Sequence, residues 1–289
     1  MRLVTALRLG RVSNLPTTWT NVVAGLVLSG AGPLHPPLLV GLCAAASCSY
    51  VGGMCLNDAF DRDYDTRERP ERPIPAGEVS AGTVFALGFS LLAAGIGLIA
   101  AIAFSSAGGQ GIPPLLAALG LAALIVFYDA YHKQNPLSPV VMALNRVLLY
   151  VTAAWSARVA LGVPLAWGCG VLLCYLIGLT YAAKQENLRQ PRGLWPLLFL
   201  QAPFLYAPAF LRVTGLLSYA LLFGWVGYSL SFLLDQRRRN VKRAVSYLIA
   251  GISLLDAMLV ASEGESLAAA LCVAGFLATL FLQRFVPGT

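Results

Sequence analysis

Charged residues are scarce in this sequence. Asp, Glu, Lys and Arg together make up 11% of its 289 residues, whereas 58% are hydrophobic and the mean hydropathy is +0.73. A soluble domain ordinarily has about 25% charged residues, so this composition excludes an ordinary soluble protein and indicates one that lies in a membrane. No stretch is left for a separate soluble domain, and we expect one membrane-embedded domain over residues 1–289.

Histidine is nearly absent, since only His35 and His132 occur and they stand far apart. The six cysteines all lie inside apolar stretches, where cysteine is a typical small core residue, and none joins a histidine at a zinc-binding spacing. The sequence shows no Ser–His or Cys–His arrangement of the kind that would indicate covalent catalysis. These shortages mean that a metal site in this chain has to be built from oxygen ligands.

Apolar stretches of the length that crosses a membrane, about 17 to 25 residues, recur along the chain. We count ten, near residues 14–31, 36–58, 80–104, 113–132, 138–160, 164–185, 194–211, 214–234, 244–261 and 266–284. The weakest boundary separates the seventh from the eighth, where only Arg212 and Gly215 interrupt the apolar run. The pattern predicts an all-α, polytopic bundle of membrane-spanning helices.

Lysine and arginine predict the orientation of these spans. If the N-terminus is cytoplasmic, lysine and arginine gather in the cytoplasmic connections between the spans. The connections on the opposite side of the membrane contain little beyond Arg158 and Arg212. The net charge of +7 is then explained by topology and contact with anionic lipid, and because the charges are divided among short loops we expect no nucleic-acid partner. We expect a multi-pass protein of a bacterial inner membrane whose active site faces the cytoplasm.

An acidic cluster follows the second apolar stretch. The run that ends at Leu56 continues directly into Asn57, Asp58, Asp61, Asp63 and Asp65, and then into Arg67, Arg69 and Arg72. If the helix continues through the acids, at ~100° per residue Asp58, Asp61 and Asp65 fall within about 60° of one another. Asn57 adjoins this face, and Asp63 points away from it.

Three carboxylates on one helical face repel one another unless positive charge lies between them. Hard oxygen ligands favour Mg²⁺, Mn²⁺ or Ca²⁺, and the arginines that follow indicate a metal-bridged phosphate or diphosphate. The alternative is a solvated helix end at which the aspartates and arginines merely pair with one another.

Two charged residues lie well inside the predicted spans. Arg146 is costly there unless it meets an anion or a carboxylate, so it is a candidate partner for a substrate phosphate or for Asp129, and a structural ion pair explains it equally well. Asp256 either accepts a hydrogen bond at a helix interface or lines a lateral opening for lipid. In the first span, Asn21 is the polar residue that we place nearest to a site.

The run NDAFDRDYD, with the RERPERPIPAG that follows it, matches the pattern N-D-x-x-D-x-x-x-D. It resembles the first signature of the UbiA superfamily of intramembrane prenyltransferases, of the 4-hydroxybenzoate polyprenyltransferase type. The resemblance implies nine helices around a central cavity, where hydropathy favours ten. It also implies Mg²⁺ as cofactor, bound by Asn57, Asp58, Asp61 and Asp65.

The second acidic signature of this family, D-x-x-Y-x-x-x-D, is degenerate here. Aligned on Tyr181, the chain has Gly178 and Gln185 in place of the acids, with Lys184 beside them. A lysine can neutralise diphosphate charge directly, in place of a second metal ion. The residues that we expect to bind diphosphate are Asn57, Arg69, Arg72, Lys133, Arg146, Tyr181 and Lys184.

These expectations describe a membrane prenyltransferase. It would use Mg²⁺ to ionise an isoprenyl diphosphate and would transfer the prenyl group to an aromatic or other lipophilic acceptor, with Asp58, Asp61, Asp65 and Lys133 as catalytic residues. The alternative is a UbiA-like protein without catalysis that binds or transports a lipid or an isoprenoid phosphate. In both cases the partners are isoprenoid and membrane lipid.

Overall fold

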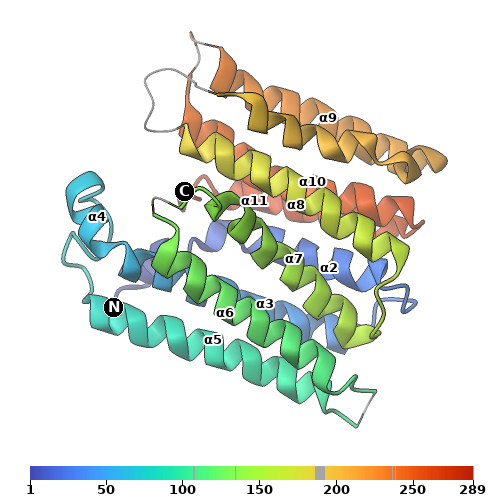
Figure 1. The fold of residues 1–289 in the computed structure, drawn as a ribbon, viewed down its shortest axis with the longest axis horizontal. Coiled ribbons are helices and arrows are strands. Elements are labelled where there is room, and N and C mark those ends of the chain that lie inside the picture. Colours follow the sequence, from blue (N-terminus) through green and yellow to red (C-terminus); the bar gives the residue numbers. More distant parts are fainter. Residues whose placement is uncertain (107, 134, 186–192, 236, 238, 289) are drawn as a thin grey trace.

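A computed structural model describes residues 1–106, 108–133, 135–185, 193–235, 237 and 239–288. Every regular element in these segments is a helix, and Figure 1 shows the long helices lying side by side in a bundle. This confirms the predicted all-α fold. Seven of the described helices are long and apolar enough to cross a membrane: α3 (Pro36–Phe60), α5 (Ala81–Ala103), α6 (Ile112–Tyr131), α7 (Ser138–Ala157), α8 (Val163–Lys184), α9 (Val213–Leu234) and α10 (Val241–Ser262).

Three of the ten expected spans are shorter elements. They are α2 (Leu15–Leu28), α11 (Ser266–Leu282) and, in place of one helix over 194–211, the 3₁₀ helices η2 (Trp195–Leu205) and η3 (Ala207–Leu211). Pro203 lies inside η2 and Pro208 at the start of η3, and proline has no N–H for the hydrogen bond that a continuous α-helix over 194–211 would need there. At ~2.0 Å per residue η2 is about 22 Å long, less than the ~30 Å of a hydrocarbon core. The described helices therefore do not confirm a count of nine or ten spans.

The acidic cluster lies where α3 passes into the short helix α4 (Arg62–Glu68). The predicted continuous helix is interrupted at Asp61, yet helical hydrogen bonds flank the interruption: the Asp61 amide donates to the Asn57 carbonyl (3.0 Å) and the Asp65 amide to the Asp61 carbonyl (2.8 Å). Asp58, Asp61 and Asp65 are consequently buried together, and the Asp63 side chain is 84% exposed. The predicted division of the acids between two faces is confirmed.

Glycine allows α3 and α5 to pack closely beside this corner. A β-carbon on Gly52 would lie 2.9 Å from the Gly88 carbonyl oxygen, and one on Gly88 would lie 2.7 Å from the Leu56 side chain. Close approach of small residues is a usual way for membrane helices to associate, because van der Waals packing supplies most of the attraction. This contact determines where the acidic C-terminal end of α3 lies.

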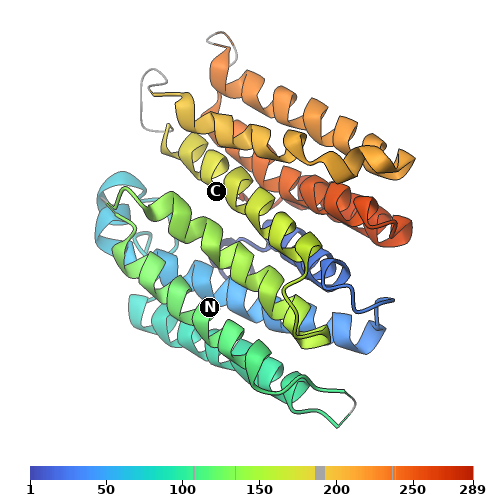
Figure 2. The same ribbon diagram turned by 45° about the vertical axis from the view of Figure 1, so that its right-hand side comes forward.

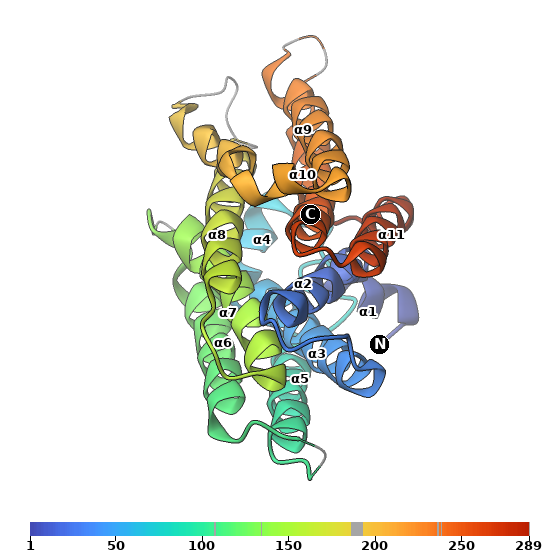
Figure 3. The same cartoon turned by 90° about the vertical axis from the view of Figure 1, so that its right-hand side faces the viewer.

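Helix α10 forms the centre of the other half of the bundle. It contacts α2, α8, α9 and α11, and 83% of its most apolar stretch is buried inside the protein. Figure 2 shows α9, α10 and α11, in orange and red, on one side of the bundle and the blue-to-green helices α3, α5 and α6 on the other. In the end-on view of Figure 3, α2 lies between the two groups, next to α1 (Leu3–Leu9) and the 3₁₀ turn η1 (Val12–Asn14) that precede it.

A buried polar network joins α2, α7 and α10. The Asp256 carboxylate accepts hydrogen bonds from the Tyr150 hydroxyl and from the Asn21 amide nitrogen (2.8 Å), and Arg146 Nη1 donates to the Asn21 amide oxygen (2.7 Å). Asp256 thus accepts hydrogen bonds at a helix interface, as one of its two interpretations expected. The hydrogen bonds of Arg146 go to α2 and not to Asp129, because α2 packs between α7 and α10.

The Asp256→Ala variant is expected to lower the free energy of unfolding by about 3 kcal/mol. It leaves the Tyr150 hydroxyl and the Asn21 amide buried without an acceptor, at ~1–3 kcal/mol for each unsatisfied group. The Asp63→Ala variant is the matched control, with an expected change of no more than about 0.5 kcal/mol, because its side chain is 84% exposed. Thermal unfolding in detergent measures both variants. Equal shifts of their unfolding midpoints would contradict the assignment of Asp256 to the buried network.

Candidate functional site

A cavity of about 650 Å³, here called the central cavity, lies between α3, α6, α7, α8 and α10. Its polar end includes Asn57, Asp61 and Lys133, and its apolar wall includes Leu121, Ile125 and Leu149. In Figure 1 α4 and the C-terminal ends of α6 and α8 lie at the same end of the bundle. A ligand with a charged group at one end and a hydrocarbon chain at the other matches this lining.

Most of the predicted diphosphate-binding residues converge on the central cavity. Its lining includes Asn57, Arg69, Arg72, Lys133, Arg146 and Lys184. Tyr181 is not part of the described lining and packs instead against the hydrophobic core around α8 and α10. Of the predicted catalytic acids, Asp61 lines this cavity, whereas Asp58 and Asp65 are not part of its described lining.

Arg72 holds two of the acids together. Its Nη1 atom lies 3.0 Å from Asp58 Oδ1 and 2.8 Å from Asp65 Oδ2, and Arg11 Nη2 lies 3.0 Å from the same Asp58 oxygen. The pairing of aspartates with arginines, which was the alternative interpretation of the cluster, is therefore present in the structure. Arg11 was not predicted as a site residue, because it lies 47 positions from Asp58 in the sequence.

Asp61 has a separate pair of partners, a lysine and a histidine. Its Oδ2 atom lies 2.9 Å from Lys133 Nζ and 3.4 Å from His132 Nε2. Burial raises the pKa of Asp61, but the hydrogen bonds from His132 and Lys133 outweigh burial and hold the pKa below its ordinary value. The Lys133 ammonium also lies 3.9 Å from the centre of the Tyr64 ring, so a carboxylate and an aromatic face hold this cation at the cavity.

Two buried carboxylate oxygens at the site have no hydrogen-bond partner within the described chain. One is Asp65 Oδ1: burial raises the pKa of this carboxyl although Arg72 opposes the shift. The other is Asp129 Oδ2, whose Oδ1 accepts from the Asn57 amide at 3.1 Å. Asp129 was not predicted as a site residue, and the signal for it is an acid at the end of a span, next to Tyr128.

The donor set of the site fits a hard divalent cation in chemistry, because it consists of oxygen atoms and two of them lack partners. Among the described residues, however, no three His, Cys, Asp or Glu side chains are grouped closely enough to ligate one ion. The ion pairs explain this arrangement, since Arg72 and Lys133 each draw carboxylates toward themselves.

The absence of the first acid of the second signature, at Gly178, has a steric explanation. A β-carbon on Gly178 would lie 2.7 Å from Leu200 Cγ of η2, so an aspartate at this point of α8 has no room. Lys184, one turn and a half further along the helix, lines the central cavity instead. This side of the cavity therefore has a cation next to Gln185, the second position at which the pattern has a carboxylate.

The sequence model of the UbiA prenyltransferase family matches residues 18–287 of this chain. A digeranylgeranylglyceryl phosphate synthase of Ignicoccus hospitalis is 33% identical over 162 residues, which are 53% of this chain and 49% of that protein. A protoheme IX farnesyltransferase of Geobacter sulfurreducens is 32% identical over 116 residues, 39% of this chain and 40% of its own. The matched region thus spans about half or less of these relatives.

Two solved structures share the fold. One, of digeranylgeranylglyceryl phosphate synthase in membranes, has a TM-score of 0.63 at 17% identity and covers 90% of this chain and 97% of its own. A UbiA homologue from Aeropyrum pernix K1 has a TM-score of 0.53 at 16% identity, with 94% and 98% covered. With a family match over nearly all of its length and seven apolar helices of spanning length, this chain is a multi-pass integral membrane protein and belongs to the UbiA prenyltransferase family.

Proposed function

We propose that this protein transfers a prenyl group from an isoprenyl diphosphate to an aromatic or other lipophilic acceptor. The observation that supports this function most directly is the lining of the central cavity, in which cationic side chains stand at one end of an apolar chamber. A transporter of isoprenoid phosphates needs a path through the membrane. A transferase, in contrast, needs only a cavity that holds the headgroup and the tail of its substrate while a bond breaks.

The cations at the polar end have a defined part in the reaction. When the carbon–oxygen bond of the diphosphate breaks, its electron pair stays with the diphosphate, and Arg69, Arg72 and Lys133 are placed to stabilise that charge. Arg146 and Lys184 add positive charge from α7 and α8. The acceptor then forms a bond to the prenyl carbon and loses one proton.

The apolar wall protects the cation that forms on the prenyl chain. Leu121, Ile125 and Leu149 come from α6 and α7 and face the central cavity. They would enclose the tail and exclude water, which would otherwise capture the carbocation. This explains why the reaction is placed between membrane helices, at the end of the bundle that the distribution of lysine and arginine assigns to the cytoplasm.

We further propose Mg²⁺ as the cofactor, held by Asn57, Asp58, Asp61 and Asp65. When bound, it would neutralise diphosphate oxygens and make the diphosphate a better leaving group. The two unsatisfied carboxylate oxygens of Asp65 and Asp129 support a place for a cation beside the central cavity. Lys184 and Arg146 supply the positive charge on the side where the second acidic signature is missing.

The alternative is a protein that binds or transports an isoprenoid phosphate without reacting. The ion pairs favour it to this extent: Asp58, Asp61 and Asp65 are each neutralised by cations of the chain itself. A site that already balances its own carboxylates can hold a ligand without a metal ion. The two functions differ in turnover, and the next experiment separates them.

Diphosphate release by the purified protein in detergent tests the proposed function. We expect release from geranyl, farnesyl or geranylgeranyl diphosphate only when a suitable acceptor from an aromatic and lipid panel is present, and we expect chelation of Mg²⁺ to stop it. Tight binding of the diphosphates without release against any acceptor would favour the alternative. Release that persists in the chelator would refute the role of Mg²⁺.

The Asp61→Ala variant is expected to lower turnover by at least about 100-fold, because it removes a carboxylate and releases Lys133 from its position. It should leave the protein folded, since the Lys133 side chain that loses its partner is 43% exposed. The rate of prenyl transfer and the thermal unfolding midpoint are measured together, with Asp63→Ala as the control that retains activity. Unchanged prenyl transfer by Asp61→Ala would contradict the assignment of Asp61 as a catalytic residue.

A further inference from the structure

A second cavity, of about 510 Å³, lies at the end of the bundle opposite the acidic cluster, and we call it the far cavity. Its lining comes from the last turns of α5 and α7, the first turns of α3 and the connection that follows α2. In Figure 1 the turn between α5 and α6 lies at this end of the bundle, whereas α4 lies at the other. The described lining is mainly apolar, with Leu26, Leu38 and Ile102 among its members, and contains no lysine or arginine.

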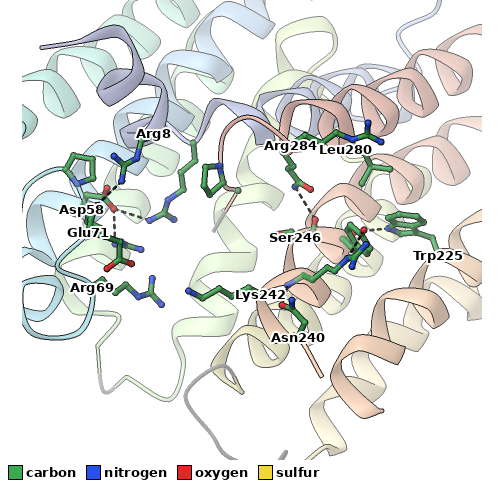
Figure 4. A pocket seen from close by; sticks show the side chains of 18 residues that line it. Arg8, Asp58, Arg69, Glu71, Trp225, Asn240, Lys242, Ser246, Leu280 and Arg284 are labelled. Atoms are coloured by element: carbon green, nitrogen blue, oxygen red, sulfur yellow. Dashed lines mark hydrogen bonds and ion pairs between the residues drawn. The ribbon is translucent and has the colours of Figure 1, made fainter. Parts of the chain in front are cut away.

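Charged side chains occupy the other end of the bundle, beyond the polar end of the central cavity. Figure 4 shows Arg8, Arg69 and Glu71 around Asp58 in a third cavity, of about 720 Å³, that adjoins the acids. Ion pairs such as that of Arg8 with Glu78 (3.0 Å) balance charges there. A hydrocarbon tail among these groups would take them out of water, which costs free energy. The tail of a ligand in the central cavity therefore extends toward the far cavity.

One cluster of buried hydrophobic side chains lies between the central cavity and the far cavity, and we call it the partition. It consists of Val22, Leu26, Leu42, Ala45, Ala46, Ile99, Ala118, Leu121, Leu149 and Ala153. Ala46, Leu121 and Leu149 line the central cavity, and Leu26 lines the far cavity. The partition thus forms a wall of both spaces.

The partition is thin along α3. Gly41 lines the far cavity and Ala46 lines the central cavity, and the two residues are about 8 Å apart along the helix at 1.5 Å per residue. Leu42 lies between them in the chain and is only 2% exposed. Because its neighbours Ala45 and Ala46 are small, the leucine supplies most of the bulk that closes the passage at this point of α3.

The partition determines the depth of the central cavity. The part of α3 that lines this cavity runs from Ala46 to Asp61, about 22 Å, and the part of α7 runs from Ser138 to Leu149, about 16 Å. An extended carbon chain advances about 1.2 Å per bond, because three backbone bonds span about 3.6 Å. An isoprene unit of four bonds is then about 5 Å long, so four units need about 19 Å and five units about 24 Å.

We propose that the partition sets the longest prenyl chain that this protein accepts, at four isoprene units. This inference rests on the proposed prenyl transfer. With the diphosphate at the polar end, a tail of four units ends against Leu121 and Leu149, and a fifth unit meets the packed side chain of Leu42. Additional atoms strain a core that is already packed. Shorter tails end before the partition, so it discriminates only against longer chains.

Equilibrium binding of geranyl, farnesyl, geranylgeranyl and geranylfarnesyl diphosphates, with two to five isoprene units, to the full chain in detergent tests the proposal without requiring turnover. We expect the five-unit chain to bind at least about tenfold more weakly than the four-unit chain, the effect of overpacking. The Ala46→Leu variant fills the end of the central cavity. It should weaken binding of the four-unit chain about tenfold and leave the two-unit chain unchanged.

The Leu42→Ala variant opens the partition toward the far cavity. It should raise the affinity for the five-unit chain about tenfold, because the overpacking is relieved. The Leu222→Ala variant is the matched control: Leu222 is fully buried on α9 in the other large core cluster and belongs to the described lining of neither cavity. Both variants lose the same three carbons, and their thermal unfolding midpoints show any general loosening of the bundle. A change of chain-length preference in Leu222→Ala as well would overturn the proposal.

Equal binding of the four-unit and five-unit chains by the unaltered protein would also overturn the proposal, because the tail would then leave the central cavity sideways between helices. If Leu42→Ala does not fold, Ala46→Leu tests the partition by itself, and an unchanged length profile in Ala46→Leu would refute it. Length-dependent binding without any transfer would refute the proposed function and leave the partition supported. Transfer with equal kcat/KM for four-unit and five-unit donors would refute the partition and leave the proposed function supported.

Discussion

The Arg72 side chain, which bridges Asp58 and Asp65, is the interaction on which the site depends. Buried carboxylates repel one another in a medium of low polarity, and this repulsion would separate α3 from α4 unless a cation lay between them. Arg72 reaches this place because the chain after α4 turns back along the acids. The same guanidinium also lines the central cavity, so one side chain balances the acids and shapes the candidate site.

The network around Asp256 plays a comparable part in the membrane interior. It connects α10, at the centre of one half of the bundle, through Asn21 of α2 to Arg146 of α7. Because Arg146 lines the central cavity, the packing of the C-terminal helices determines where this cation lies. The cationic lining of the central cavity is thus supported at two places, by the Arg72 cluster and by the Asp256 network.

Helical periodicity was sufficient to predict that Asp58, Asp61 and Asp65 share a buried face and that Asp63 does not. The partners of these acids were not predictable in the same way. Arg11 comes from the turn between α1 and η1 and Asp129 from α6, and only tertiary packing against α3 brings them to the cluster. The interrupted span over 194–211 was misjudged for a local reason, since hydropathy ignores that Pro203 and Pro208 prevent a continuous α-helix.

The altered second signature changes how negative charge is balanced in the central cavity. A pair of acids on α8 would recruit a second divalent ion, which can bridge two phosphate oxygens. Gly178 has no room for an acid against Leu200, and the ammonium of Lys184 is a single charge that cannot bridge in this way. Arginines such as Arg69 and Arg72, which line this cavity, can form paired contacts with phosphate oxygens. Under the proposed function, the absence of acids on α8 leaves the diphosphate to Arg69 and Arg72, which line the central cavity.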